Sequence, residues 1–472
     1  MHRAVSRTRP VAAAVDAADR TVGDAVEAAV RAHHRRRLRR AGWPPAAGEG
    51  EWARGGTPPR SGNRLAIHVD GRNAFPVIAA AIDGAQRSVE IAGWHLSPDL
   101  PMRESGPTRT VREVLAAAAE RVPVRVLLWA GPPAPLFHPW RSEVRRSRDE
   151  LMRGTAVRCA LDSRNRPMHC HHEKIVIVDG RVAFVGGIDL SRLEGNRFDG
   201  APHSREPGLG WHDAAAEIEG PAVIDVARHL VMRWQAVTGE ALPSPSPVEP
   251  AGGSTVQIVR TVPEGTYPAV PRGDFTLLDA TASALRGARR LVYIENQFLW
   301  SSEIVQILAG RLRDGGDDMR VVVLLPAHPK TGADDTRGQL DLLSQADPGG
   351  RFLACTLKSP TGGEVYVHAK VTIVDDRWMS VGSGNLNAHS LFNDTEMDVV
   401  TDDTALIRAT RERLWAEHLG DDRATGMDAR LAIDGILRPA AQSGSGALTT
   451  LAGGSRRVSR LLGPLQSLLV DG

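Results

Sequence analysis

Lysine is scarce in this chain of 472 residues. Only four of its 58 basic residues are lysines, at positions 174, 330, 358 and 370, and the others are arginines. A chain that uses arginine for generic positive charge is expected to keep lysine where a compact ammonium is needed and a wide guanidinium does not fit. The alternative is chance retention under a GC-rich coding bias. The surroundings of each lysine decide between these explanations.

Cysteine is also rare, and long apolar runs are missing. The three cysteines, Cys159, Cys170 and Cys355, are too few and too scattered for a disulfide framework or a zinc site, and they fit a reducing compartment. The N-terminal residues lack the continuous apolar core of a secretory signal, and no stretch approaches the roughly 18 apolar residues needed to span a bilayer. We therefore expect a cytoplasmic protein. A formal net charge of +2 points to no particular class of partner.

Composition divides the chain into five parts. A basic extension contains a predicted helix from Asp19 to Ala41 that ends in the run HHRRRLRR, and a Pro/Ser-rich segment later separates two units of similar pattern. The last part interleaves basic and apolar residues. The predicted parts are 1–63 (extension and linker), 64–240 (first repeat), 241–256 (linker), 257–422 (second repeat) and 423–472 (tail).

The two central units are copies of one pattern. Each opens with a helical segment followed by a short apolar run, at residues 71–94 and 272–298, and continues with a second apolar run, at 122–133 and 318–329. Strands that alternate with helices predict an α/β fold with mixed, largely buried sheets. We therefore expect two similar α/β repeats packed side by side.

Each repeat also carries the same chemical motif. A histidine is followed by any residue, a lysine, four further residues and an aspartate: His172, Lys174 and Asp179 in the first repeat, and His368, Lys370 and Asp375 in the second. The two histidines lie 196 residues apart. On a strand, residues i and i+2 point to the same face, so the histidine and lysine of each motif project together.

This pairing of histidine and lysine suits phosphate chemistry. A histidine can act as a nucleophile or general acid near neutral pH, and a neighbouring ammonium neutralises charge on the phosphate oxygens. A core histidine beside a surface lysine is the ordinary explanation of one such motif, but two copies in matching repeat positions argue against it. We predict one active site at the interface of the repeats, and two of the four lysines belong to it.

The motifs and their surroundings resemble the phospholipase D superfamily, and in particular its eukaryotic-type pattern. The resemblance covers about residues 64–420 and includes segments beyond the motifs: GWHLSP (93–98), VAFVGGIDL (182–190), WHD with EGPAVIDV (211–226), YIENQF (293–298) and GSGNLNAHS (382–390). It implies a phosphodiesterase that hydrolyses or transphosphatidylates glycerophospholipids through a phosphohistidine. We expect no cofactor and no metal site, because no matching ligand spacing is present.

The resemblance also implies a role for each matching residue. His172 is assigned as the nucleophile and His368 as the acid and base, although spacing does not distinguish them. Lys174 and Lys370 are expected to hold the phosphate oxygens. Asn385 and Ser383 are expected to bind substrate. Asp179 and Asp375 complete the two catalytic motifs. The last two lie an odd number of residues from their histidines and face away on a regular strand.

A catalytic imidazole needs an acceptor on its other nitrogen. Aligning the two copies places Glu396 opposite Asp213. We predict that Glu396 orients His368 and that Asp213 orients His172, with Asp199 as the competitor for the second role. The cluster of His169 and His171 beside the first motif lacks matching metal ligands, so we expect these histidines at the rim of the site.

Three other functions share parts of this pattern. A phosphatidyltransferase of the cardiolipin-synthase type carries both motifs but typically has N-terminal membrane helices. A nuclease of the superfamily would favour a basic groove around the motifs, and a lipid-binding scaffold would have lost a motif residue. We expect a phospholipid substrate, no nucleic acid, and possible peripheral contact with an anionic membrane through the basic termini. One chain supplies both motifs, so a monomer is sufficient for the site.

Overall fold

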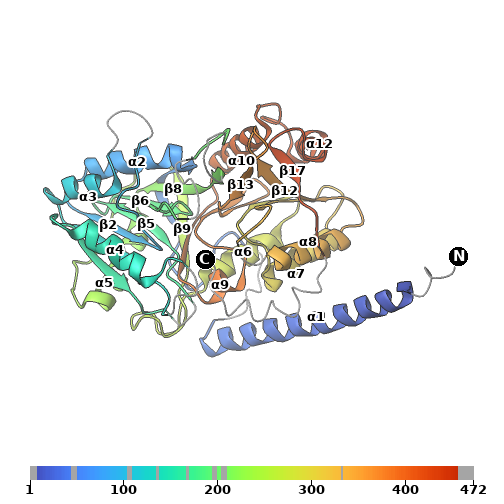
Figure 1. Ribbon diagram of the computed structural model, residues 1–472, viewed down its shortest axis with the longest axis horizontal. Helices are drawn as coiled ribbons and strands as arrows, with labels where there is room; N and C mark the ends of the chain where they lie inside the picture. Colours follow the sequence, from blue (N-terminus) through green and yellow to red (C-terminus); the bar gives the residue numbers. More distant parts are fainter. Residues whose placement is uncertain are drawn as a thin grey trace.

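The body of the molecule consists of two mixed β-sheets with helices around them, and a long helix lies along one side (Figure 1). The computed structural model describes residues 8–43, 50–103, 109–133, 138–165, 169–193, 199–203, 210–330 and 333–454. The basic and apolar residues of the predicted tail from 455 onwards lie outside these described residues. The predicted mixed α/β class is confirmed.

The first sheet has the strand order β4-β3-β2-β5-β6-β8-β1. Its strands are β1 Arg60–Val69, β2 Val89–Gly93, β3 Val124–Trp129, β4 Arg158–Asp162, β5 Lys174–Val178, β6 Val182–Gly186 and β8 Ala214–Glu219. Its helices are α2 Gly71–Asp83, α3 Val111–Ala119, α4 Arg141–Met152 and α5 Val223–Thr238. All five residues of β5 are buried, as expected for an apolar strand that is covered on both faces.

The second sheet repeats this order as β12-β11-β10-β14-β15-β16-β9. Its strands are β9 Ser254–Thr261, β10 Leu291–Glu295, β11 Arg320–Leu324, β12 Phe352–Lys358, β14 Val371–Val374, β15 Trp378–Gly382 and β16 Glu396–Thr401. The helices of this half are α6 Thr276–Gly287, α7 Ser302–Asp314, α8 Ala333–Gln345, α9 Ala388–Phe392 and α10 Thr404–Leu419. In both sheets the motif strand, β5 or β14, lies next to the second strand of its half, β2 or β10.

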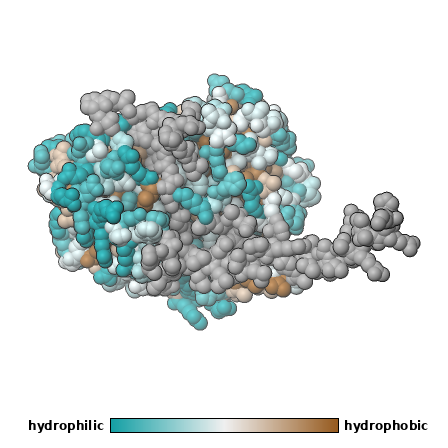
Figure 2. All heavy atoms as spheres, in the orientation of Figure 1, coloured by the Kyte–Doolittle hydropathy of each residue, from teal (hydrophilic) through white to brown (hydrophobic). Residues whose placement is uncertain are grey.

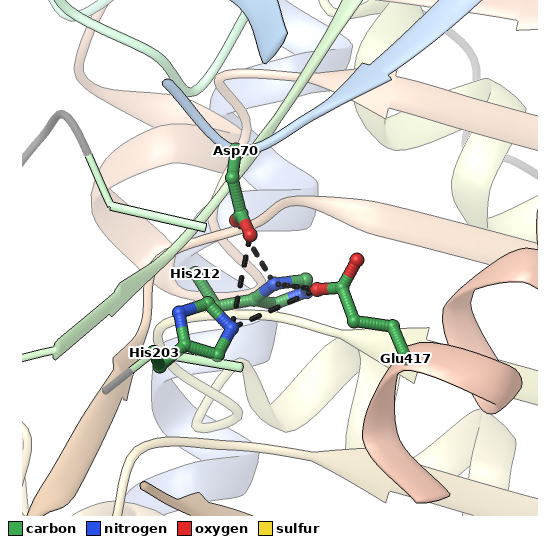
Figure 3. A group of neighbouring side chains, drawn as sticks. All are labelled: Asp70, His203, His212 and Glu417. Carbon is green, nitrogen blue, oxygen red and sulfur yellow. Dashed lines mark ion pairs between the residues drawn. The ribbon is translucent and has the colours of Figure 1, made fainter. Parts of the chain in front are cut away.

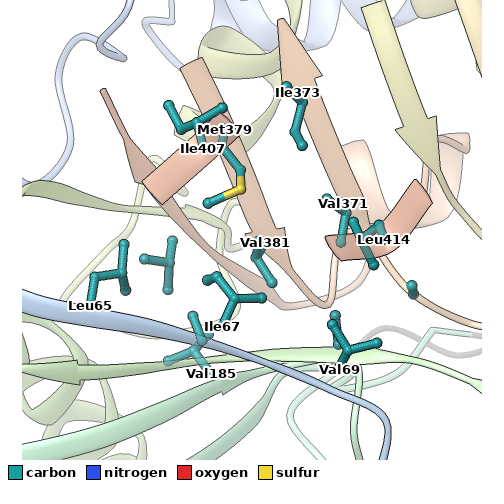
Figure 4. Close-up of a cluster of buried hydrophobic side chains, with 14 of the residues drawn as sticks. Leu65, Ile67, Val69, Val185, Val371, Ile373, Met379, Val381, Ile407 and Leu414 are labelled. Atoms are coloured by element: carbon teal, nitrogen blue, oxygen red, sulfur yellow. The ribbon is translucent and has the colours of Figure 1, made fainter. Parts of the chain in front are cut away.

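The two sheets share strand pairing and a hydrophobic core. β1 pairs with β8 of its own sheet and with β9 of the other, and the short strands β7 Gly210–His212 and β13 Glu364–Val367 pair in parallel across the halves. Between the sheets, Ile67 and Val185 of the first half pack with Val371, Val381 and other residues of the second (Figure 4). Burial of this shared surface holds the halves together.

The basic extension forms helix α1 Thr8–Arg40, which begins earlier than the predicted start at Asp19. Its last turns dock on the second half: His34 bonds Glu303 at 2.8 Å, and Arg37 bonds Glu264 at 2.7 Å. The intervening Arg35 and Arg36 are exposed. Part of the basic run therefore binds the protein itself, and part faces solvent.

Two segments outside the predicted repeats belong to the sheets. β1 begins at Arg60, before the predicted start at residue 64, because the Gly/Pro-rich sequence there hides its strand character. After residue 422 the chain forms α11 Ala429–Ala432, a π-helical turn Ile433–Leu437, α12 Arg438–Ser443 and β17 Leu448–Thr450. β17 pairs antiparallel with β12 and extends the edge of the second sheet.

The described surface is largely hydrophilic on the face shown in Figure 2, where single hydrophobic side chains lie among polar ones. Large exposed hydrophobic residues are scattered over different elements: Val22, Trp140, Met152 and Leu431. Within the described ranges, none of the helices has both the length and the apolar composition needed to cross a membrane.

Candidate active site

Each motif lies where its chain segment enters the motif strand. Lys174 begins β5, and Lys370 directly precedes β14. His172 and His368 lie just before them, and all four side chains are buried, with 2–6% of each residue exposed. The two motifs therefore occupy equivalent positions at the ends of equivalent strands.

The backbone of each motif is bonded to the opposite half of the molecule. The amides of His172 and Glu173 donate to the carbonyl oxygen of Thr395, at 2.9 and 3.1 Å. The amides of His368 and Ala369 donate in the same way to the carbonyl oxygen of His212, at 2.8 and 3.1 Å. This exchange brings both histidines to the interface of the two sheets.

The exchange also decides which carboxylate holds which imidazole. His172 Nδ1 lies 3.0 Å from Glu396 Oε1, and His368 Nδ1 lies 2.7 Å from Asp213 Oδ2. The predicted partners were therefore wrong in their pairing, because Glu396 and Asp213 directly follow the residues that bond the opposite motif. Asp199 is not the partner of His172, since its carboxylate bonds His203 and the Trp211 amide.

The two lysines point toward their own histidines but have different neighbours. Lys174 Nζ donates to the carbonyl oxygen of His172 at 2.6 Å, and Lys370 Nζ donates to that of His368 at 2.5 Å. Lys174 Nζ lies 3.9 Å from the carboxylate of Asp189, whereas Lys370 Nζ donates to the amide oxygen of Gln297 at 3.3 Å. The first lysine therefore has a carboxylate near its ammonium, and the second has an amide oxygen in that place.

The two residues predicted to bind substrate lie beside these groups in different ways. Asn385 is fully buried, its Nδ2 lies 3.5 Å from Gln297 Oε1, and its Oδ1 has no hydrogen-bond partner among the described residues. Ser383 donates its hydroxyl to Glu396, and Ser390 donates to the same carboxylate. Asn385 therefore stays a candidate ligand, while Ser383 acts on the carboxylate that holds His172.

The aspartates of the two motifs serve the fold. Asp179 accepts the amides of Gln86, Arg87 and Ser88 just before β2. Asp375 likewise accepts the amides of residues 289–291 at the start of β10. Their inclusion among the catalytic residues is corrected by this position at the far end of the motif strands, as their odd spacing indicates.

His172 and Glu396 form the first catalytic dyad, and His368 and Asp213 form the second. The electrostatics of the first dyad favour an uncharged His172 imidazole. Burial lowers the pKa of His172 well below its usual value, and the charges of Lys174 and of Lys370 from the other half lower it further. Burial also raises the pKa of Glu396 to about 8, opposed by the charge of Lys174 and the hydroxyls of Ser383 and Ser390. A neutral imidazole with a carboxylate on Nδ1 can present the lone pair of Nε2 as a nucleophile.

Aromatic rings pack on both histidines. Trp94 meets His172 edge-on, with ring centroids 6.5 Å apart, and Trp211 lies 4.9 Å from His368.

The predicted rim residues around the first motif are more deeply placed than expected. His171 is fully buried and bonds Thr395 at 2.9 Å, and His169 is 9% exposed beside Asp394.

A buried polar network behind the first motif was missed in the sequence. Glu173, between the histidine and lysine of the motif, pairs with Arg233 and with His229. Arg233 also bonds Asp162 at 2.9 Å. An acid at the middle position of the first motif, where the second has alanine, is the sequence signal for this network.

Comparison with known proteins agrees with this geometry. A family model described as "Cardiolipin synthase, PLD-like domain" matches residues 282–417. The chain is 25% identical to Phospholipase D A of Dictyostelium discoideum over 77% of its length, and 25% identical to Phospholipase D alpha 4 of Arabidopsis thaliana over 75%. The chain belongs to the phospholipase D superfamily.

The chain matches only part of the length of its relatives, and it also resembles a solved structure. The chain spans 36% of the length of the Dictyostelium relative and 64% of the Arabidopsis one. The crystal structure of a phosphatidylserine synthase from Haemophilus influenzae Rd KW20 superimposes with a TM-score of 0.50 at 11% identity, covering 75% of this chain and 86% of that one. This structural likeness supports a phospholipase D fold.

Proposed function

We propose that this phospholipase D superfamily member is a phosphodiesterase that cleaves glycerophospholipids. The observation that supports the proposal is the pair of buried histidines, each with a carboxylate on Nδ1 and a lysine beside it. Relatives named phospholipase D match about three quarters of the chain. The substrate class is taken from these relatives, and the chemistry from the site.

In the first step, Nε2 of His172 attacks the phosphorus atom. The bond from phosphorus to the oxygen of the head group breaks, and His368 donates a proton to the leaving alcohol. Lys174, Lys370 and Asn385 stabilise the charge on the non-bridging oxygens. The product is a phosphatidyl group bound to His172 through nitrogen.

In the second step, His368 removes a proton from water, and the resulting oxygen nucleophile attacks the same phosphorus. The bond between phosphorus and Nε2 breaks, which releases phosphatidic acid and restores both histidines. An alcohol in place of water gives a new phosphodiester by the same route. Glu396 and Asp213 hold the two rings in the tautomers that these steps require.

A phosphatidyltransferase of the cardiolipin-synthase type is the second candidate. It is favoured by the description of the family model that matches the second half. The two functions share both chemical steps and differ in the acceptor, which is water in one and a lipid alcohol in the other. Acceptor competition therefore separates them.

To test the proposal, purified protein is incubated with mixed vesicles of choline, ethanolamine and glycerol phospholipids, and separately with single-stranded DNA. We expect phosphatidic acid and free head group from at least one lipid, and none from His172→Ala protein. Cardiolipin without phosphatidic acid would favour the second candidate. DNA cleavage with every lipid untouched would contradict the proposal.

Contact with an anionic membrane surface is a further part of the proposal. Arg35, Arg36, Arg39 and Arg40 at the end of α1 are exposed, while the same turns dock on the second half through His34. A rigidly held row of arginines beside the body of an enzyme could bind lipid phosphates without inserting.

A further inference from the structure

Four metal-ligating side chains converge behind the second histidine of the site. Asp70 follows β1, His203 lies in the described segment 199–203, His212 ends β7, and Glu417 lies in the last turn of α10 (Figure 3). They come from both halves of the chain and from four different elements. One ligand atom of each lies within 4.8 Å of the other three.

Three of these four groups are buried and the fourth is half-buried, and they approach one another at ion-pair distances without forming hydrogen bonds. Asp70 is 1% exposed, His203 7% and His212 0%, and the Glu417 side chain is 12% exposed. Asp70 Oδ2, His203 Nε2, His212 Nδ1 and Glu417 Oε1 have no hydrogen-bond partner within the described part of the chain. Ion-pairing atoms that are withdrawn from water without hydrogen bonds carry a desolvation cost, which a cation between them would offset.

The spacing of the four groups suits a small tetrahedral cation. His212 Nδ1 lies 3.1 Å from Asp70 Oδ1 and 3.3 Å from Glu417 Oε1, and His203 Nε2 lies 3.7 Å from Asp70 Oδ2 and from Glu417 Oε1. Zinc bonds of about 2.0–2.1 Å in a tetrahedron place ligand atoms about 3.3–3.4 Å apart. The contacts around the group therefore bracket the zinc geometry.

The opposite nitrogen of each imidazole supports the same conclusion. His203 Nδ1 lies 3.1 Å from Asp199 Oδ2, and His212 Nε2 lies 2.9 Å from Glu295 Oε2. A carboxylate behind a histidine fixes its tautomer and turns the lone pair of the other nitrogen toward the metal. With two neutral imidazoles and two carboxylates, a divalent ion makes the cluster neutral.

Two other clusters of possible metal ligands lack these properties. His212, Glu295 and His418 form a second group, but its contacts are hydrogen bonds of 2.9 and 2.8 Å that already satisfy the atoms that meet. His169, His389 and Asp394 form a group of three, and Asp394 already accepts the amide of Cys170. In the cluster of four, each residue has one ligand atom without a hydrogen bond within the described residues.

We propose that Asp70, His203, His212 and Glu417 bind one zinc ion in a closed site. Four protein ligands leave no open position, so the ion is structural and takes no part in the chemistry. It ties the end of β1 and the 199–203 segment to β7 and α10. The sequence predicted no metal here, because Asp70 and Glu417 lie 133 and 205 residues from the nearer of the two histidines and the four residues follow no ligand spacing.

The site lies against the second catalytic dyad. Asp70 Oδ1 accepts the amide of Asp213 at 2.9 Å, and the carbonyl oxygen of His212 accepts the amide of His368. Two zinc ligands therefore hold the backbone of both members of the dyad. The ion stabilises the position of His368 through Asp70 and His212.

The test measures the metal content of the full chain, purified without a histidine tag and without chelators. Mass spectrometry of the wild type is expected to find about one zinc per chain. His203→Asn should lose this zinc, whereas His328→Asn, a change at an exposed histidine, should keep it. His418→Gln should also keep it, because His418 belongs to the neighbouring cluster alone.

A second measurement does not depend on the folding of any variant. Prolonged dialysis of the wild type against a strong chelator should lower its melting temperature by about 5 °C or more, and added zinc should restore it. Cobalt in place of zinc should give the intense visible bands of a tetrahedral site. Metal-free wild type after growth with zinc, or zinc retained in His203→Asn, would overturn the proposal.

Discussion

At the scale of single residues, we predict that neither motif lysine can be replaced by arginine without loss of activity. Both are buried, and each donates to a backbone carbonyl within its own motif. Lys174→Arg or Lys370→Arg should reduce kcat/KM on a soluble phosphodiester by about 100-fold, because the wider guanidinium displaces the phosphate from the line of attack. The exposed Lys358 gives the matched control, and Lys358→Arg should be silent. Near-normal activity in the motif variants would show that the lysines supply generic charge alone.

The crossed dyads make the nucleophile testable. On a nitrophenyl phosphodiester, whose leaving group needs no proton, Asp213→Asn should impair only the second step and give a burst of nitrophenol. Glu396→Gln should slow the first step and give no burst, since it acts on His172. Stopped-flow absorbance measures both. The reverse result would assign the attack to His368.

The pKa of Glu396 predicts the pH dependence of the first step. Its raised value of about 8 means that the carboxyl group is ionised above pH 8 and protonated below it. The protonated acid would donate to Nδ1 of His172 and move the ring proton to Nε2, which blocks attack. kcat/KM should therefore rise with pH through about 8, and Glu396→Gln should lose this limb. If the rise of kcat/KM with pH persists in Glu396→Gln, it reports the ionisation of another group.

The sequence predicted both carboxylates that hold the two histidines but not which carboxylate meets which histidine. The matching positions of Asp213 and Glu396 follow from aligning the copies, and the structure uses both. Which carboxylate meets which histidine depends on the bonds from Thr395 and His212 across the interface, and no local pattern records them. The sequence did not predict the partners of Glu173, because they lie in α5, 56 and 60 residues further along the chain.

At the scale of elements, helix α1 divides its basic residues between two surfaces. Replacing the exposed Arg35, Arg36, Arg39 and Arg40 by glutamine should weaken binding to phosphatidylglycerol vesicles at least about tenfold and leave the melting temperature unchanged. Vesicle sedimentation at low and high salt measures the effect. Arg37→Gln is the matched control, and it should lower the melting temperature because Arg37 pairs with Glu264. Equal binding by the fourfold variant would exclude this surface.

The repeated elements were the most predictable part of the fold. Short apolar runs such as VTIV of β14 are buried on both faces, which their composition indicates. β17 escaped prediction because a strand of three residues carries too little pattern, and it exists through its pairing with β12. The start of β1 was hidden for a related reason, since glycine and proline surround it.

At the scale of the whole molecule, the shared core predicts that the halves act as one unit. A protease site placed in the exposed linker between Pro243 and Pro247 should allow the chain to be cut without loss of activity. The fragments should elute together in gel filtration, because strands β1 and β9 and the core between the sheets still hold them. Separation of the fragments under native conditions would contradict the shared core.

The exchange of carboxylates between the halves has a consequence for how the two copies can change over time. A single copy could not complete its own histidine and would need a second copy as a partner. Joined in one chain, the copies are free to specialise, provided that each keeps the acid the other requires. The differences between them follow this rule. Glu173 is equivalent in position to Ala369 of the second repeat, and Asp189 is equivalent to Asn385, while Glu396 and Asp213, the acids that hold the histidine of the other half, are both present. The two copies therefore differ in the residues around each histidine and agree in supplying the carboxylate that the histidine of the other half requires.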